Sequence, residues 1–181
     1  MTDLCSEDII IKKGGGGLRI WIKRGSDSAE GGIWLRCANG MDGRLRCFFL
    51  DFVKWLRSRY AFPVRVNVYL KNTEQIRAMD GEYVSAVIFT PFDRSGTPFI
   101  KIAVGDFYAL REKHGEFNAL CSTVSSLAHE LIHYYQWLSG EEKSEVCEER
   151  QARYYARKKV YEYLEERGYD FWDKINRSEK I

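Results

Sequence analysis

The sequence predicts an α+β protein, because strand-like segments come mainly first and long helical segments come last. Short segments rich in alternating or β-branched apolar residues predict strands at 18–23, 32–37, 64–70, 83–90 and 99–104. Apolar residues that recur at intervals of three and four predict helices at about 42–60, 117–138 and 142–167. No internal repeat is visible in this order of elements.

The first predicted strands are short and lie between loop residues. LRIWIK (18–23) follows four glycines at 14–17, and the polar segment RGSDSAEGG separates it from GIWLRC (32–37). A phosphate-binding loop requires a helix directly after its glycines, so we interpret this run as an ordinary loop. The helical pattern at 42–60 ends just before Pro63, as helices commonly do near a proline.

Three further strands lead to the C-terminal helices. VRVNVYL (64–70) alternates valines with polar residues, whereas YVSAVIFT (83–90) is apolar and rich in β-branched residues. FIKIAV (99–104) follows the turn sequence TPFDRSGTP. The helical pattern at 117–138 has one continuous apolar stripe, and the break at Ser139-Gly140 separates it from the last helix.

Composition and net charge give no indication of several classes of function. A length of 181 residues suits one domain with a sizeable core. The net charge of +2 is too close to zero to predict binding to nucleic acid or to a membrane surface. No apolar run reaches the roughly 18 residues of a membrane span. The five scattered cysteines and the lack of a secretory signal pattern predict reduced thiols and a cytoplasmic protein.

One short motif predicts chemistry. His129 and His133 lie four residues apart, with Glu130 directly after the first. On a helical wheel both histidines lie opposite the apolar stripe and about 40° apart, so their imidazoles can bind one zinc ion. Glu130 points about 100° further round the helix, where it can act as general base on a zinc-bound water. This HExxH pattern predicts a zinc metallopeptidase.

A catalytic zinc ion takes three protein ligands, so one ligand remains to be found. His114 precedes the helix and would have to fold back over several turns to reach the metal. Cys121 belongs to the apolar stripe, and Cys147 would be an unusual ligand among several carboxylates. The next helix is the better source, because the break at Ser139-Gly140 allows it to turn back beside the first.

We predict Glu149 as the third ligand. Glu149, Ala152 and Ala156 are spaced three and four residues apart and therefore share one helix face. Alanines beyond a carboxylate let two helices approach closely, which a ligand from a neighbouring helix requires. Glu148 and Glu145 have similar geometry and remain alternatives.

HELIH (129–133) and ERQARYYA (149–156) resemble the zincin metallopeptidases of the gluzincin type. The small size and the short distance between the two helices are similar to minigluzincins and to the catalytic domains of ImmA/IrrE-like regulators. The resemblance covers about 99–164. It implies a zincin-like fold, with a mixed sheet packed on an active-site helix and a second helix that carries the glutamate ligand.

The resemblance also implies an endopeptidase that uses Zn2+, with the substrate extended along an edge strand through main-chain hydrogen bonds. FIKIAV (99–104) occupies the corresponding place, and Pro98 at its start suits an edge. We accordingly expect a zincin-like catalytic core at 64–168. It would be preceded by a β-rich segment plus a helix at 1–63, which can belong to the same domain, and followed by a tail at 169–181.

The alternative hypothesis is a catalytically silent or latent zincin-fold protein with a binding or regulatory role. In that case the C-terminal segment RGYDFWDKINRSEKI, with Phe171 and Trp172, is a candidate plug for the cleft. Many zincins stabilise the oxyanion with a tyrosine or histidine. Tyr154, Tyr155 and Tyr161 are better explained by helix packing, so we assign none of them this role.

Overall fold

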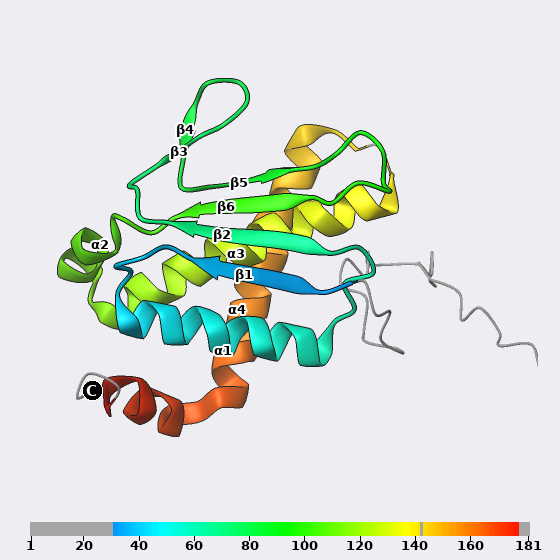
Figure 1. Ribbon diagram of the computed structural model, residues 1–181. Coiled ribbons are helices and arrows are strands. Elements are labelled where there is room, and N and C mark those ends of the chain that lie inside the picture. The colour runs from blue at the N-terminus through cyan, green and yellow to red at the C-terminus, as the bar shows by residue number, and fades with distance from the viewer. Residues whose placement is uncertain (1–30, 142, 178–181) are drawn as a thin grey trace, which may run out of the picture.

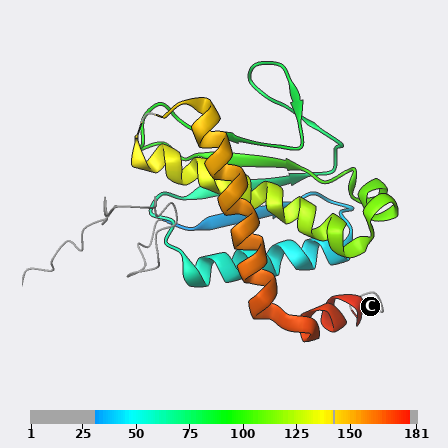
Figure 2. The ribbon, with the colours of Figure 1, turned by 180° about the vertical axis from the view of Figure 1, so that it is seen from behind.

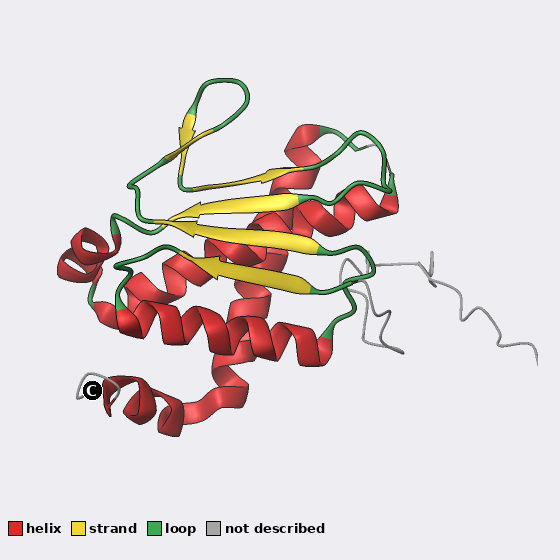
Figure 3. Cartoon of the chain, in the orientation of Figure 1, coloured by secondary structure: helices red, strands yellow, loops and turns green. Residues whose placement is uncertain are grey.

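The computed structural model describes residues 31–141 and 143–177, with residues 169–177 as backbone only. Its elements, shown in Figure 1, are β1 (Ile33–Cys37), α1 (Gly43–Arg59), β2 (Val66–Lys71), β3 (Ile76–Arg77), β4 (Tyr83–Val84), β5 (Ala86–Phe89), β6 (Phe99–Ala103), α2 (Phe107–His114), α3 (Glu116–Ser139) and α4 (Glu145–Arg177). The predicted strand at 18–23 and the glycine run at 14–17 lie outside the described residues. Figure 3 shows that the fold is α+β, as predicted.

The main sheet is mixed, with four strands in the order β1-β2-β6-β5. β1, β2 and β6 run parallel, whereas β5 pairs antiparallel with β6. β3 and β4 form a separate two-stranded hairpin, which extends beyond β5 in Figure 1. This arrangement leaves β5 as the outermost strand on the side of the hairpin.

One apolar core joins the sheet to the helices. The inward residues of β2 and β6, such as Val68 and Ile100, are fully buried against α1 and α3. Phe48 and Phe52 of α1 belong to the same cluster, and burying each ring contributes about 1.5–3 kcal/mol. β1 and α1, which come from the first 63 residues, therefore share their core with the rest of the described chain.

Helix α1 begins and ends where the sequence predicts. Asp42 caps it, because its Oδ1 accepts hydrogen bonds from the backbone N–H groups of Arg44 and Leu45, at 2.9 and 3.1 Å. Such a cap satisfies donors that have no partner within the helix. The helix ends at Arg59, ahead of Pro63.

Helices α3 and α4 cross on the helical side of the sheet, as Figure 2 shows. α3 ends at Gly140, whose φ of 60° is the left-handed conformation that glycine adopts without strain. The chain then turns back, and α4 packs on α3 with Ala152 and Ala156 buried in the contact. The predicted break at Ser139-Gly140 is therefore confirmed.

Helix α4 extends further than the sequence predicts. Its φ/ψ angles become non-helical at Gly168, and a second helical segment continues to Arg177. In Figure 1 this segment lies near α1, at the opposite end of α4 from Glu149. The side chains of Phe171 and Trp172, on which the plug hypothesis depends, lie outside the described residues. No described helix is long and apolar enough to cross a membrane.

Some local predictions are wrong. The predicted strand at 83–90 divides at Ser85 into β4 and β5, and the hairpin strand β3 was not predicted. His114 precedes α3, as the sequence indicates, but it is the last residue of a short helix, α2, that was not predicted. The predicted helix at 117–138 should carry a continuous apolar stripe, but its first residue, Phe117, is 45 % exposed because it lies in the first turn of α3.

The prediction that 99–104 is an edge strand is also wrong. β6 lies between β2 and β5, with a parallel neighbour on one side and an antiparallel neighbour on the other. The edge strand beside α3 is β5 instead. Pro98 is compatible with this internal position because it lies just before the strand, where its carbonyl accepts the backbone N–H of Asn67.

Candidate metal centre

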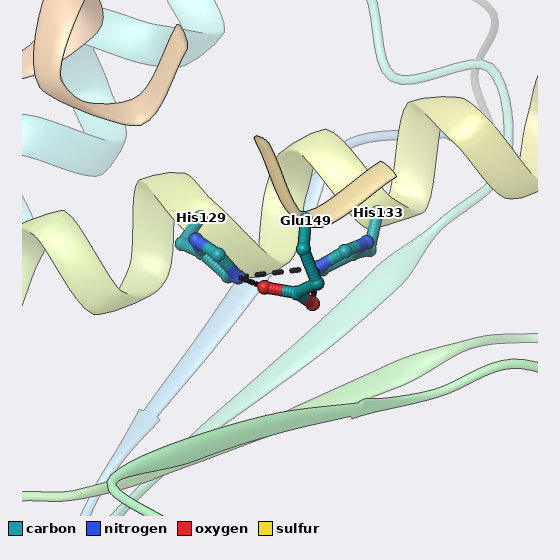
Figure 4. Close-up of side chains that lie close together, drawn as sticks. All are labelled: His129, His133 and Glu149. Carbon is teal, nitrogen blue, oxygen red and sulfur yellow. Dashed lines mark hydrogen bonds and ion pairs between the residues drawn. The ribbon is translucent and has the colours of Figure 1, made fainter. Parts of the chain in front are cut away.

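Three predicted ligands converge between α3 and α4. Figure 4 shows the imidazoles of His129 and His133 pointing from α3 toward the carboxylate of Glu149, which comes from α4. The two Nε2 atoms are 3.1 Å apart. Glu149 Oε2 lies 3.4 Å from His129 Nε2, and Glu149 Oε1 lies 3.0 Å from His133 Nε2.

These separations fit a zinc ion. With bonds of 2.0–2.1 Å, two ligand atoms of a tetrahedral zinc site lie about 3.3 Å apart. The separation of the two Nε2 atoms and the distances from each of them to one oxygen of the Glu149 carboxylate bracket this value. Two imidazoles with one carboxylate form a donor set typical of a catalytic zinc site. Three protein ligands leave a fourth coordination position for water or substrate.

The structure also distinguishes Glu149 from its alternatives. Among the described residues, His129, His133 and Glu149 are the one group of three metal-binding side chains whose ligand atoms lie within 4.8 Å of one another. Glu148 lines the same cleft, but its side chain is not part of this group. Glu145 is exposed at the start of α4.

Gln136, which the sequence analysis did not select, orients His133. The Gln136 side-chain NH2 donates to the backbone carbonyl of Glu148 at 3.1 Å, so its oxygen faces His133. His133 Nδ1 lies 2.7 Å from that oxygen and therefore donates its hydrogen to it. The Nε2 atom of neutral His133 then keeps its lone pair for a metal ion, as second-shell partners of zinc-bound histidines commonly ensure. The sequence does contain a signal for this contact, because Gln136 lies three residues after His133 and therefore on the same side of the helix.

Glu130 lies beside the candidate centre but points in a different direction. Its side chain is buried, with 7 % of its surface exposed, between α3 and the edge strand. Burial raises the pKa of Glu130 to about 7, although a hydrogen bond from the backbone N–H of Ile88 acts in the opposite direction. A carboxyl group with a pKa near neutrality can both accept and donate a proton.

Burial also lowers the pKa of His129. The neighbouring His133 and the guanidinium of Arg153 act in the same direction, whereas Glu149 raises this pKa. The neutral imidazole favoured by these effects is the form that binds metal ions.

A cleft of about 1220 Å³ surrounds these residues. β5 forms one wall, α3 provides the floor with Ser122, Ser125 and Ser126, and the first turns of α4 form the other wall. Small-molecule sites typically measure roughly 300–1,000 Å³, so this open cleft suits a larger, extended ligand. Arg153 and Arg157, one and two turns beyond Glu149, also line it.

The remaining candidates do not reach the centre. His114 is exposed at the end of α2, and Cys121 is partly buried in the core, where burial raises its pKa to about 11. Cys147 is a free thiol outside the ligand group. Tyr154 and Tyr161 are more than 60 % exposed and, like Tyr155, do not line the cleft.

Comparison with protein-family models, curated proteins and solved structures finds no match to this chain.

Proposed function

We propose that the protein is a zinc-dependent endopeptidase of the gluzincin type with a zincin-like fold. The observation that carries this proposal is the convergence of His129 Nε2, His133 Nε2 and the Glu149 carboxylate. The two Nε2 atoms are 3.1 Å apart, and each has one of the two carboxylate oxygens within 3.0–3.4 Å. Such a convergence of electron pairs is unfavourable unless a proton or a cation lies among them. The adjacent cleft is large enough for a peptide chain.

A zinc ion bound here would lower the pKa of a coordinated water toward 7 and polarise a substrate carbonyl. Glu130 would accept the proton of the attacking water and then transfer it to the leaving amine. Its burial supports this role, because its pKa is already near neutrality. Gln136 would hold His133 in the tautomer that binds the metal.

The substrate would lie extended along β5, the edge strand, rather than along β6. Main-chain hydrogen bonds to an edge strand bind a peptide independently of its sequence, and pockets on either side then select its side chains. The residues of β5 from Ala86 to Ile88 line the cleft opposite the candidate metal ligands. Arg153 and Arg157 would favour a substrate with an acidic group at their end of the cleft.

The test compares metal content and hydrolysis in matched variants. We expect the wild-type protein to bind about one zinc ion per chain and to cleave a labelled unfolded protein. Glu130→Gln should retain the metal and lose at least about a hundredfold in rate, since a general base contributes 10²–10⁴-fold. His133→Ala and Glu149→Ala should lose both. Elemental analysis and a peptide-release assay measure these outcomes.

Glu145→Ala is the control, because this exposed glutamate lies one turn before Glu149 and outside the ligand group. Equal zinc content in wild type and Glu149→Ala would contradict the ligand assignment. Full turnover by Glu130→Gln would contradict the mechanism. Zinc retention without any hydrolysis by the wild type would instead support the binding or regulatory hypothesis.

A further inference from the structure

The face of the sheet opposite the helices has its own chemical character. Alternate residues of each strand point away from the core, and the strand register aligns them in rows across the sheet. The first row contains Trp34, Asn67, Phe99 and Phe89, one from each strand in the order β1-β2-β6-β5. The second row contains Arg36, Tyr69, Lys101 and Val87 in the same order. We call these residues, with Arg65 and Lys71, the outer sheet face.

Aromatic side chains lie at two places on the outer sheet face. Trp34, near the start of the edge strand β1, is 52 % exposed. Phe89 and Phe99 stack with their ring centroids 4.7 Å apart, and Tyr69 meets Phe99 edge to face at 6.3 Å. Tyr69, Phe89 and Phe99 are only half-buried by this packing, and Trp34 is exposed, so the outer sheet face keeps apolar surface in contact with water that a flat apolar group can cover.

Cations lie among these rings. The Arg65 guanidinium carbon is 4.5 Å from the centre of the Trp34 ring, and Lys101 Nζ is 4.9 Å from that of Phe89. Arg36 and Lys71 lie on either side of Tyr69, at 5.8 and 5.6 Å. The four strands of this sheet contain no Asp or Glu. The outer sheet face is therefore strongly cationic, although the chain as a whole has a charge of only +2.

This combination favours single-stranded nucleic acid as the ligand. Bases stack on aromatic rings, and phosphates pair with Lys and Arg, so a single strand uses both features together. The two rows lie about 7 Å apart along the strands, and the four strands span about 14 Å, enough for a few nucleotides. A duplex keeps its bases stacked inside the helix and cannot use the aromatic rings. An acidic peptide would use the cations but leave most rings uncovered.

We propose that the outer sheet face binds single-stranded nucleic acid, with one base stacked on the exposed ring of Trp34, neighbouring bases packed against the Phe89–Phe99 pair, and phosphates paired with Arg36, Arg65, Lys71 and Lys101. This site lies on the face away from the helices and does not depend on the candidate metal centre. It adds a binding function to the one proposed for the cleft.

The test uses the full chain and fluorescein-labelled 20-nucleotide oligo-dT and oligo-U, with fluorescence anisotropy measured between 50 and 200 mM salt. We expect binding by the wild type that weakens steeply with salt. Trp34→Ala should weaken it about tenfold at every salt concentration, because one stacking platform is lost. The double variant Arg36→Glu/Lys101→Glu should weaken it more than tenfold and make the salt dependence shallower.

The matched control is Lys113→Glu/Lys158→Glu, which makes the same change in net charge at exposed positions on α2 and α4. Circular dichroism verifies that each variant is folded. Absence of binding by the wild type at 50 mM salt overturns the proposal. An equal loss in the control variant, equal binding of a duplex, or equal binding of a poly-glutamate peptide also overturns it, since each indicates attraction by charge alone.

Discussion

Two regions of the molecule differ in how their charged side chains are paired: the contact between α1 and α4, and the cleft between α3 and α4. In the α1–α4 contact, Lys159 Nζ donates to Tyr60 Oη at 2.8 Å and to Glu162 Oε2 at 2.7 Å. Further along the same contact, the hydroxyl of Tyr163 and the Nε–H of Arg167 both donate to Asp51 Oδ2. Each charged group there has a partner of opposite charge.

Within the described part of the chain, Glu130 and the candidate metal centre lack such pairs with Lys or Arg. Glu130 is buried, and no cationic side chain of the described residues lies within 4.0 Å of its carboxylate. The ligand atoms of His129, His133 and Glu149 face one another and present electron pairs to the same point. A network whose charges are paired stabilises the fold, whereas imidazole lone pairs and a carboxylate that converge without a cation among them identify the place where an external cation is expected to bind.

The largest expected effect concerns the stability of the metal-free protein. The pKa of Glu130 rises from 4.5 in the unfolded chain to about 7 in the folded protein. Below pH 4.5 the carboxyl group is protonated in both states and does not lower the free energy of unfolding. Above pH 7 it is ionised in both states, and its burial lowers the free energy of unfolding by the largest amount. The stability of the wild type should therefore fall as pH rises from about 4.5 to above 7. Glu130→Gln removes this cost and should raise the free energy of unfolding by about 3 kcal/mol at pH 8.

Urea unfolding of EDTA-treated wild type and Glu130→Gln at pH 4.5 and pH 8 measures this difference. The two proteins should differ little at pH 4.5. A variant that is less stable than the wild type at pH 8 would show that the Glu130 carboxylate is a structural group, like those of the α1–α4 contact.

The second effect concerns the hydrogen bond between Gln136 and His133. Gln136→Leu removes the acceptor that holds the His133 Nδ1–H, so zinc affinity should fall by about 10–100-fold. Gln136→Glu keeps an oxygen in this position and should retain most of the affinity. Competition with a fluorescent zinc chelator measures both. Equal zinc affinity in wild type and Gln136→Leu would show that zinc binding does not depend on the hydrogen bond between Gln136 and His133.

The smallest expected effect concerns the paired charges in the contact between α1 and α4. Glu162→Gln removes the charge that pairs with the buried Lys159, and should lower the free energy of unfolding by about 1 kcal/mol without changing zinc content. Glu112→Gln, an exposed position on α2, serves as control. Thermal unfolding of both variants gives the comparison. A gain in stability for Glu162→Gln would mean that the pairing of charges is not what distinguishes this contact from the cleft.

Patterns within one helix were predictable from the sequence. The break at Ser139-Gly140 and the spacing of His129 and His133 depend on helix geometry, which repeats every 3.6 residues and is therefore visible in a short segment. The alanines after Glu149 similarly indicated a close helix contact, and Ala152 and Ala156 are buried there.

The order of strands was not predictable, because β5 and β6 are both short and apolar and their places depend on pairing between distant segments. Only the tertiary structure therefore assigns the edge to β5 and aligns Trp34 with Phe99 and Phe89, from three separate strands, in one row. The sequence by itself determined which side chains one helix presents to the cleft. The tertiary structure decided which segments face them, because a turn of helix is a local property whereas the packing of strands and helices depends on the whole chain.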